Sequence, residues 1–146
     1  NINENYLIAS SYLNIGNIYS DGFKLNNEAM MFYQKALKTA KRVDVMIEED
    51  RREKVELLSK ICLRISAIHL DYKNPDEAFT FILRAKKHQE SIQESSFLKS
   101  HLAFMFGRYY AQKEALYNAI VNFDNAIKYI SHQFCNCMSI RFIKTC

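Results

Sequence analysis

The sequence predicts an all-α fold built from about three helix hairpins. Of its 146 residues, 49% are hydrophobic, which is too apolar for a disordered chain. One proline and three glycines are too few for the many turns of an all-β fold. The third observation is a pattern of small and aromatic residues that recurs three times along the chain.

Each copy of this pattern places one small residue on a first helix and two alanines on a second helix. The alanines are seven residues apart in every copy (36−29, 85−78 and 126−119). The first alanine follows the small residue by 12 positions in the second and third copies (78−66 and 119−107), but by 13 in the first (29−16). The small residues are Gly16, Ser66 and Gly107, and the alanines are Ala29 and Ala36, Ala78 and Ala85, and Ala119 and Ala126.

This spacing has a packing reason. Two antiparallel helices joined by a short turn approach closely only where both carry small side chains. A glycine in a helix interior costs about 0.5–1 kcal/mol relative to alanine, so Gly16 and Gly107 need such a contact. We therefore expect Gly107 to allow the close approach of Ala119 and Ala126.

The pattern resembles the tetratricopeptide repeat, whose second helix carries A-x3-F-x2-A. The resemblance covers about residues 6–131 and is strongest in the third copy. It implies a right-handed superhelix of stacked hairpins whose first helices line a concave groove, with a C-terminal helix after the third hairpin. Successive copies are 50 and 41 residues apart (66−16 and 107−66), against 34 in the standard repeat. We expect longer helices to fill the difference, in one domain over 1–146 with repeats at about 5–48, 52–90 and 95–131.

In the first repeat we expect helices over about 5–20 and from Asn26 or Asn27 onward. Gly22 suits the left-handed position that ends a helix. Asn26 or Asn27 suits the capping position of the next helix, which could continue through Ile47.

In the second repeat we expect a helix over about 52–71 and another that begins at Pro75. Proline is favoured in the first turn of a helix, and Asn74 could cap it. In the third repeat, Ser95 or Ser96 starts the first helix, and the second helix covers about 115–130. Residues 132–146 would form a separate helix, as a cap over the end of the stack or a partial repeat.

Charge and composition restrict the classes of partner. The net charge of +4 is too dilute to indicate direct nucleic-acid binding. No apolar run is long enough to cross a membrane. Four cysteines without a secretory signal favour free thiols in the cytoplasm. The chain does not begin with methionine, and we expect it to be a fragment of a longer protein.

We expect neither catalysis nor a cofactor. The sequence has no glycine-rich phosphate loop, no H-E-x-x-H pattern and no plausible Ser/His/Asp grouping. The group formed by His132, Cys135, Cys137 and Cys146 lacks the C-x2-C spacing of structural zinc sites, so we expect no metal.

Candidate binding residues are those next to the buried small residue of each first helix, which would point into the groove. Asparagine side chains can bond an extended peptide backbone, lysine and arginine can bind a carboxylate, and phenylalanine can form an apolar pocket. The seven candidates are Asn14, Asn17, Lys60, Arg64, His101, Phe104 and Arg108.

Two functions fit these residues. Repeats of about 40 residues in an Asn/Ile/Lys-rich chain resemble the Rap and PlcR group of Gram-positive regulators, which implies a sensor domain for a short quorum-sensing peptide. In chaperone-binding members of the repeat family, a lysine, an arginine and an asparagine hold a C-terminal carboxylate, and Lys60, Arg64 and Asn14 resemble part of that clamp. The alternative is therefore a general scaffold or co-chaperone-like adaptor. A homodimer, an enzyme accessory domain and a metal-binding tail also remain open.

Overall fold

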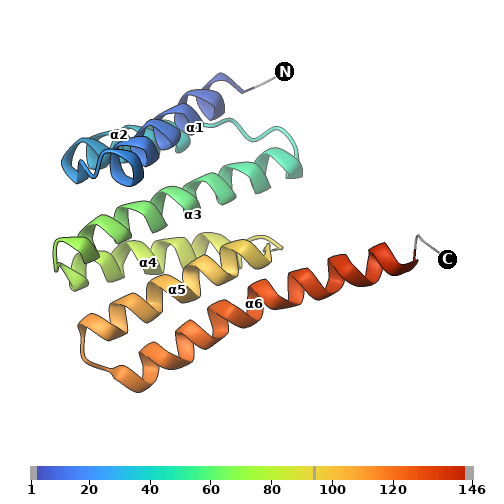
Figure 1. The fold of residues 1–146 in the computed structure, drawn as a ribbon. Coiled ribbons are helices and arrows are strands. Elements are labelled where there is room, and N and C mark those ends of the chain that lie inside the picture. The colour runs from blue at the N-terminus through green and yellow to red at the C-terminus, as the bar shows by residue number, and fades with distance from the viewer. Residues whose placement is uncertain (1–2, 94, 144–146) are drawn as a thin grey trace.

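The computed structural model describes the backbone of residues 3–93 and 95–143, and the side chains of these residues up to His132. Every regular element in this part of the chain is a helix, and adjacent helices pack in pairs, which confirms the all-α prediction (Figure 1). No helix described is both long and apolar enough to span a membrane. The helices are α1 (Glu4–Asn17), η1 (Ile18–Gly22), α2 (Asn26–Ala40), α3 (Glu48–Asp71), α4 (Pro75–Glu90), α5 (Ser96–Gln112) and α6 (Leu116–Ile143).

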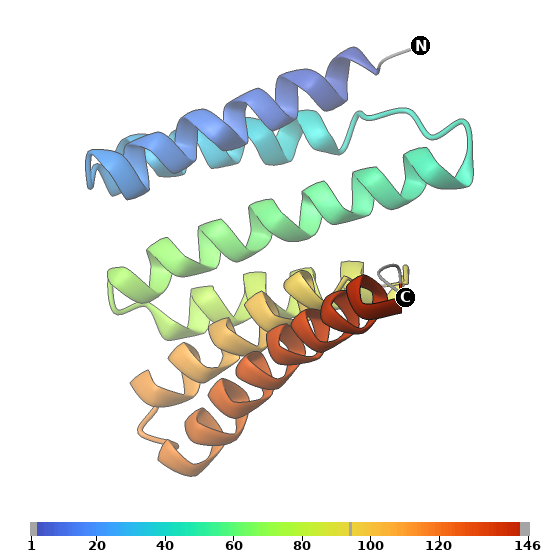
Figure 2. The same ribbon diagram turned by 45° about the vertical axis from the view of Figure 1, so that its right-hand side comes forward.

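The three helix pairs α1–α2, α3–α4 and α5–α6 lie one after another (Figure 2). Each first helix also packs against the pair before it, since α3 contacts α1 and α2, and α5 contacts α3 and α4. Among the described residues, the second helices α2, α4 and α6 do not pack against one another. The first helices therefore form a continuous layer, and the second helices do not.

Buried apolar clusters join each pair to the next. Ile61 and Ile65 of α3 are buried with Ala9 and Leu13 of α1 and with residues of α2. Leu63 on the same helix is buried with residues of α4 and with Met105 of α5. The helix α3 thus belongs to both clusters, as a helix in the middle of a stack must.

The turn inside each pair has the same construction. Each turn has three residues, at 23–25, 72–74 and 113–115. Lys24, Lys73 and Glu114 have φ of 58°, 59° and 59°, and each lies five residues before the first alanine of the second helix. The left-handed residue of the first turn is therefore Lys24, and the expectation that Gly22 takes this role is wrong, because Gly22 still belongs to η1.

The extra residue of the first pair lies in a helix, not in the turn. The residues Ile18–Gly22 form a π-helix, whose wider turn accommodates one more residue than an α-helix. The amide of Leu25 donates to the carbonyl of Tyr19, six positions back, at 2.9 Å. The equivalent amides of Asn74 and Ala115 donate to carbonyls only five positions back. The insertion thus leaves the turn and the second helix in the same positions as in the other pairs.

The glycines of the first helices face aromatic rings. A Cβ atom on Gly16 would lie 2.5 Å from the Tyr33 ring, and one on Gly107 would lie 2.6 Å from the Phe123 ring. Real Cβ atoms do not approach carbon this closely. The expectation that Gly107 makes room for Ala119 and Ala126 is thus corrected, because the residue that needs this space is the aromatic between the two alanines.

Two helix boundaries differ from the sequence prediction. The helix α2 ends at Ala40, and residues 41–47 are not helical. The Lys54 ammonium donates to the carbonyls of Lys41 and Val43 at 3.1 and 2.8 Å, which fixes the connection. The Asp50 carboxylate accepts from the backbone amides of Met46 and Ile47, so α3 begins at Glu48, not near Arg52.

The last helix also differs. The expected separate helix from residue 132 is absent from the described chain, because α6 continues unbroken from Leu116 to Ile143. No glycine or proline interrupts this stretch. By contrast, the expected starts at Pro75 and Ser95 are confirmed: Pro75 opens α4, and the Ser95 hydroxyl accepts from the amide of Leu98 at 3.2 Å.

We predict that Gly107→Ala destabilises the protein by up to about 2 kcal/mol, although alanine is the better helix former. Overpacking against Phe123 costs about 1–3 kcal/mol, against about 1 kcal/mol gained from helix propensity. Urea unfolding measures the difference. Gly22→Ala is the control, because its Cβ would meet only Ile18 at 3.9 Å, and it should not destabilise. Equal or greater stability of Gly107→Ala would contradict the assigned packing.

We predict that Lys73→Gly raises the free energy of unfolding by about 0.5–1 kcal/mol, because a left-handed φ is unfavourable for lysine and free for glycine. Thermal unfolding tests this, with Gln34→Gly as the opposite case. Gln34 is exposed in the interior of α2, where glycine should cost about 1 kcal/mol. A loss of stability for Lys73→Gly would show that this turn has another conformation.

Candidate functional site

An apolar depression lined by three of the predicted binding residues, Arg64, His101 and Phe104, lies between α5 and α6. It has a volume of about 550 Å³, and we name it the α5–α6 groove. One residue of α3, four of α5 and four of α6 line it. These are Arg64; Phe97, Ser100, His101 and Phe104; and Phe123, Ala126, Ile127 and Ile130.

Helical spacing brings these side chains together. On α5, Phe97, His101 and Phe104 follow one another at intervals of four and three residues and so share a face. At the base of the groove, the buried Ser100 hydroxyl donates to the carbonyl of Ala126 at 2.8 Å and ties the two helices together. The rings of Phe104 and Phe123 contact each other with centroids 5.6 Å apart. The groove is therefore a shaped surface formed by two helices that are locked to each other.

His101 is the only imidazole in the groove lining and is uncharged at neutral pH. Burial lowers its pKa to about 4, and the nearby Arg64 guanidinium acts in the same direction. Its ring also contacts Phe97, with centroids 6.2 Å apart. The groove therefore offers a neutral hydrogen-bonding imidazole among apolar side chains.

Two of the predicted cations already have carboxylate partners. Arg64 donates to both carboxylate oxygens of Asp21 at 3.0 and 3.2 Å, and Arg108 donates to Asp71 at 2.7 Å. Asp21 and Asp71 each follow the small residue of their own helix by five positions (21−16 and 71−66). Each ion pair thus links one helix pair to the next. Both are partly exposed to solvent, and pairs of this kind contribute about 0.2–1 kcal/mol.

The remaining predicted residues are divided. Asn17 is half-buried, and its side-chain oxygen accepts from the Tyr33 hydroxyl at 2.9 Å, so it supports the first pair from inside. Asn14 and Lys60 are exposed on α1 and α3. The structure therefore brings Arg64, His101 and Phe104 together at one groove and gives Asn17 and Arg108 internal partners.

Sequence reasoning missed part of the groove. None of Phe97, Phe123, Ile127 and Ile130 is among the seven candidate binding residues. Their positions in the repeat could have indicated that these side chains are exposed, because no first helix of the described chain follows the third pair and covers them.

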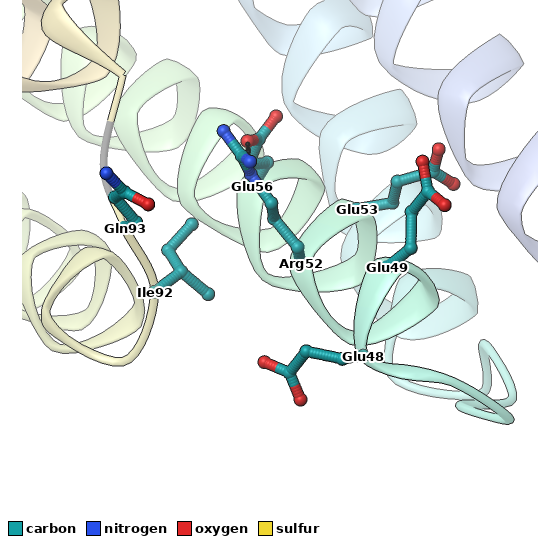
Figure 3. Close-up of a pocket in the computed structure, with 7 residues that line it drawn as sticks. All are labelled: Glu48, Glu49, Arg52, Glu53, Glu56, Ile92 and Gln93. Atoms are coloured by element: carbon teal, nitrogen blue, oxygen red, sulfur yellow. Dashed lines mark hydrogen bonds and ion pairs between the residues drawn. The ribbon is translucent and has the colours of Figure 1, made fainter.

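A second depression, of about 570 Å³, lies where α3 begins and α4 ends (Figure 3). Glu48 and Glu49 point away from each other in this view. Glu48 pairs with Arg51 at 2.7 Å, and Glu56 pairs with Arg52 at 3.1 Å. Its lining is Glu48, Glu49, Arg52, Glu53, Glu56, Ile92 and Gln93. The described residues contain no group of three or more His, Cys, Asp or Glu that could hold a metal.

Cys62 is a free, buried thiol, as the sequence predicts for the chain, and burial raises its pKa to about 11. The side chains of Cys135, Cys137 and Cys146 lie outside the described residues.

We predict that His101 makes stability fall as the pH drops from about 6.5 to about 4. The folded-state pKa lies below that of the unfolded chain, so the unfolded state binds the extra proton in this window. His101→Gln should therefore lose less stability than the wild type between pH 7 and pH 4. Urea titrations at several pH values measure this, and His132→Gln, an exposed histidine, is the control. Parallel pH profiles for the wild type and His101→Gln would contradict the assignment.

Comparison with models of protein families, with curated proteins and with solved structures finds no match.

Proposed function

We propose that this chain is a tetratricopeptide-like interaction module that binds a segment of another polypeptide. The observation that carries the proposal is the α5–α6 groove, which exposes aromatic and aliphatic side chains beside Arg64 and His101. Large contiguous apolar patches on a protein surface commonly mark binding sites.

The regularity of the helix pairs supports the tetratricopeptide-like part of the proposal. Three turns carry a left-handed residue at the same position, and two of the three pairs place a glycine against an aromatic ring. First helices that pack together beside second helices that do not are the arrangement expected of a curved, right-handed superhelix. In such a stack the layer of α1, α3 and α5 is the concave side.

The chemistry of the groove indicates what it binds. Phe104 and Ile127 offer contacts to apolar side chains, and the neutral His101 can exchange a hydrogen bond with a peptide backbone. Arg64 could receive a carboxylate only if that carboxylate competes with Asp21. Because their ion pair is partly exposed, such an exchange costs little.

Two biological roles are consistent with this chemistry. A short peptide in the groove would suit the sensor domain of a bacterial signalling or transcriptional regulator. The C-terminus of a protein partner would suit an adaptor, with Lys60, Arg64 and Asn14 around its carboxylate. The first is the role we propose, because aromatic and aliphatic side chains make up most of the groove lining.

We predict that a screen of short peptides yields ligands whose affinity falls about tenfold with Phe104→Ala, equivalent to about 1.4 kcal/mol of lost apolar contact. Fluorescence anisotropy measures the dissociation constants. Val121→Ala, on the outer face of α6, is the matched control and should bind like the wild type. Absence of any ligand, or equal affinity for Phe104→Ala, would contradict the proposal.

The same screen separates the two roles. Each ligand is made as the free acid and as the C-terminal amide. Loss of affinity on amidation and with Arg64→Ala would indicate the adaptor. Equal affinity for the free acid and the C-terminal amide would favour the peptide sensor.

A further inference from the structure

The α5–α6 groove occupies, on the third pair, the place that a helix fills on the other two. Phe104 corresponds to Leu13 on α1 and Leu63 on α3, because each precedes the small residue of its helix by three positions. Leu13 is 7% exposed and Leu63 is fully buried, whereas Phe104 is 45% exposed. The difference is that α3 covers the first pair and α5 covers the second.

The second helices give the same result independently. Ile130 follows the second alanine of its helix by four residues, as do Ala40 and Gln89 in the other pairs. Ala40 and Gln89 are fully buried, and Ile130 is exposed. The groove therefore has the shape of a docking site for a first helix. No helix of the described chain occupies it.

The other end of the stack carries an apolar helix face that matches such a docking site. Leu7 on α1 corresponds to Leu57 on α3, and Ile18, the first residue of η1, corresponds to Ile68, in each case fifty positions later. Ile68 is 1% exposed, because it belongs to the apolar face with which α3 packs against the first pair. Ile18 is 57% exposed, and Leu7 is also exposed. The helix α1 thus presents the docking face of a first helix with no pair in front of it among the described residues.

We propose that the α5–α6 groove binds α1 of a second copy of this chain, so that copies join head to tail. The inference rests on the proposed function, that the groove binds a polypeptide segment, and names the segment. The joint between copies would repeat the packing by which α3 meets the first pair and α5 meets the second.

The charges at the two ends agree with this assignment. The internal joints pair Asp21 with Arg64, and Asp71 with Arg108. At the end of α5 the position of Asp71 is taken by Gln112, and on α1 the positions of Arg64 and Arg108 are taken by Asn14 and Asn17. The acid and its arginine are thus both replaced by neutral amides. Copies that meet in this register bring no unpaired charge into the joint from these positions.

No helix of the described chain occupies the α5–α6 groove. In the first two pairs the second helix ends at Ala40 and Glu90, and the chain returns as the next first helix. The helix α6 instead continues to Ile143, past the start of α5 (Figure 1). A joint between a groove on one copy and a helix on the next is heterologous, so we expect association to grow with concentration and not to stop at a symmetric dimer.

The test uses one variant for each side of the joint. Ile127→Glu places a charge in the groove, and Ile18→Glu places one on the docking face of α1; both residues are exposed, so the fold should tolerate the changes. Light scattering after gel filtration measures mass. We expect the wild type to exceed the 17.2 kDa of one chain increasingly with concentration, and each variant alone to remain at that mass.

The decisive sample is an equal mixture of the two variants. The intact α1 of the Ile127→Glu chain can enter the intact groove of the Ile18→Glu chain, so the mixture should form a dimer of twice the single-chain mass and nothing larger. Val121→Glu is the matched control on α6, because the corresponding Met31 and Thr80 are exposed and no helix covers this position. It should associate like the wild type, and circular dichroism checks that each variant is folded.

A wild type that remains a single chain at the highest soluble concentration would overturn the inference. So would variants that still associate alone, or a mixture that forms no dimer. The peptide screen distinguishes this failure from that of the proposed function. Peptide binding that is lost with Phe104→Ala in a monomeric chain would leave the proposed function standing and remove only the second copy as partner.

Discussion

The contact between a residue without a side chain on the first helix and a ring on the second fixes how the hairpins pack. Gly16 and Gly107 let the rings of Tyr33 and Phe123 lie directly on the backbone. Ser66 serves the second pair in a different way, because its hydroxyl turns back to donate to the carbonyl of Leu63 at 2.7 Å. Each solution determines the rotation of the first helix about its axis. All other faces of that helix, toward the next pair and toward solvent, follow from this rotation.

The links between pairs depend on the same rotation. With the small residue turned toward its partner, the aspartate five positions later lies where the next first helix can reach it. The two arginines that reach these aspartates are not at equivalent positions, since Arg64 precedes its small residue by two and Arg108 follows it by one. Long, flexible guanidinium side chains allow this difference. The apolar contacts fix the register, and the ion pairs adapt to it.

The sequence predicted those features that depend on neighbouring residues. Pro75 and Ser95 act on their own helix, and the helix starts predicted from them are confirmed, whereas the residue that faces Gly107 is the Phe123 ring and not the predicted alanines. The end of α2 at Ala40 depends on Lys54, and the start of α3 depends on a carboxylate that caps two amides, so periodicity alone placed both wrongly. The ion-pair partners of the candidate cations could not be predicted from neighbouring residues, because Arg64 and Arg108 pair with carboxylates 43 and 37 residues away in the sequence.

The exposure of side chains can be compared between equivalent positions in the three helix pairs. Residues at one position share the same local backbone, so a difference in their exposure reports what lies in front of them. A stack that ends in water requires polar outer faces at its terminal helices. Here Leu7 of α1 and Ile18 of η1 are exposed, as are Phe104 and Ile127 of the α5–α6 groove. Burying apolar surface gains about 25 cal/mol for each Å², so faces of this composition favour cover by another helix. The amides Gln112, Asn14 and Asn17 take the positions of both partners of the ion pairs, so that a second copy in this register adds no unpaired charge from these positions.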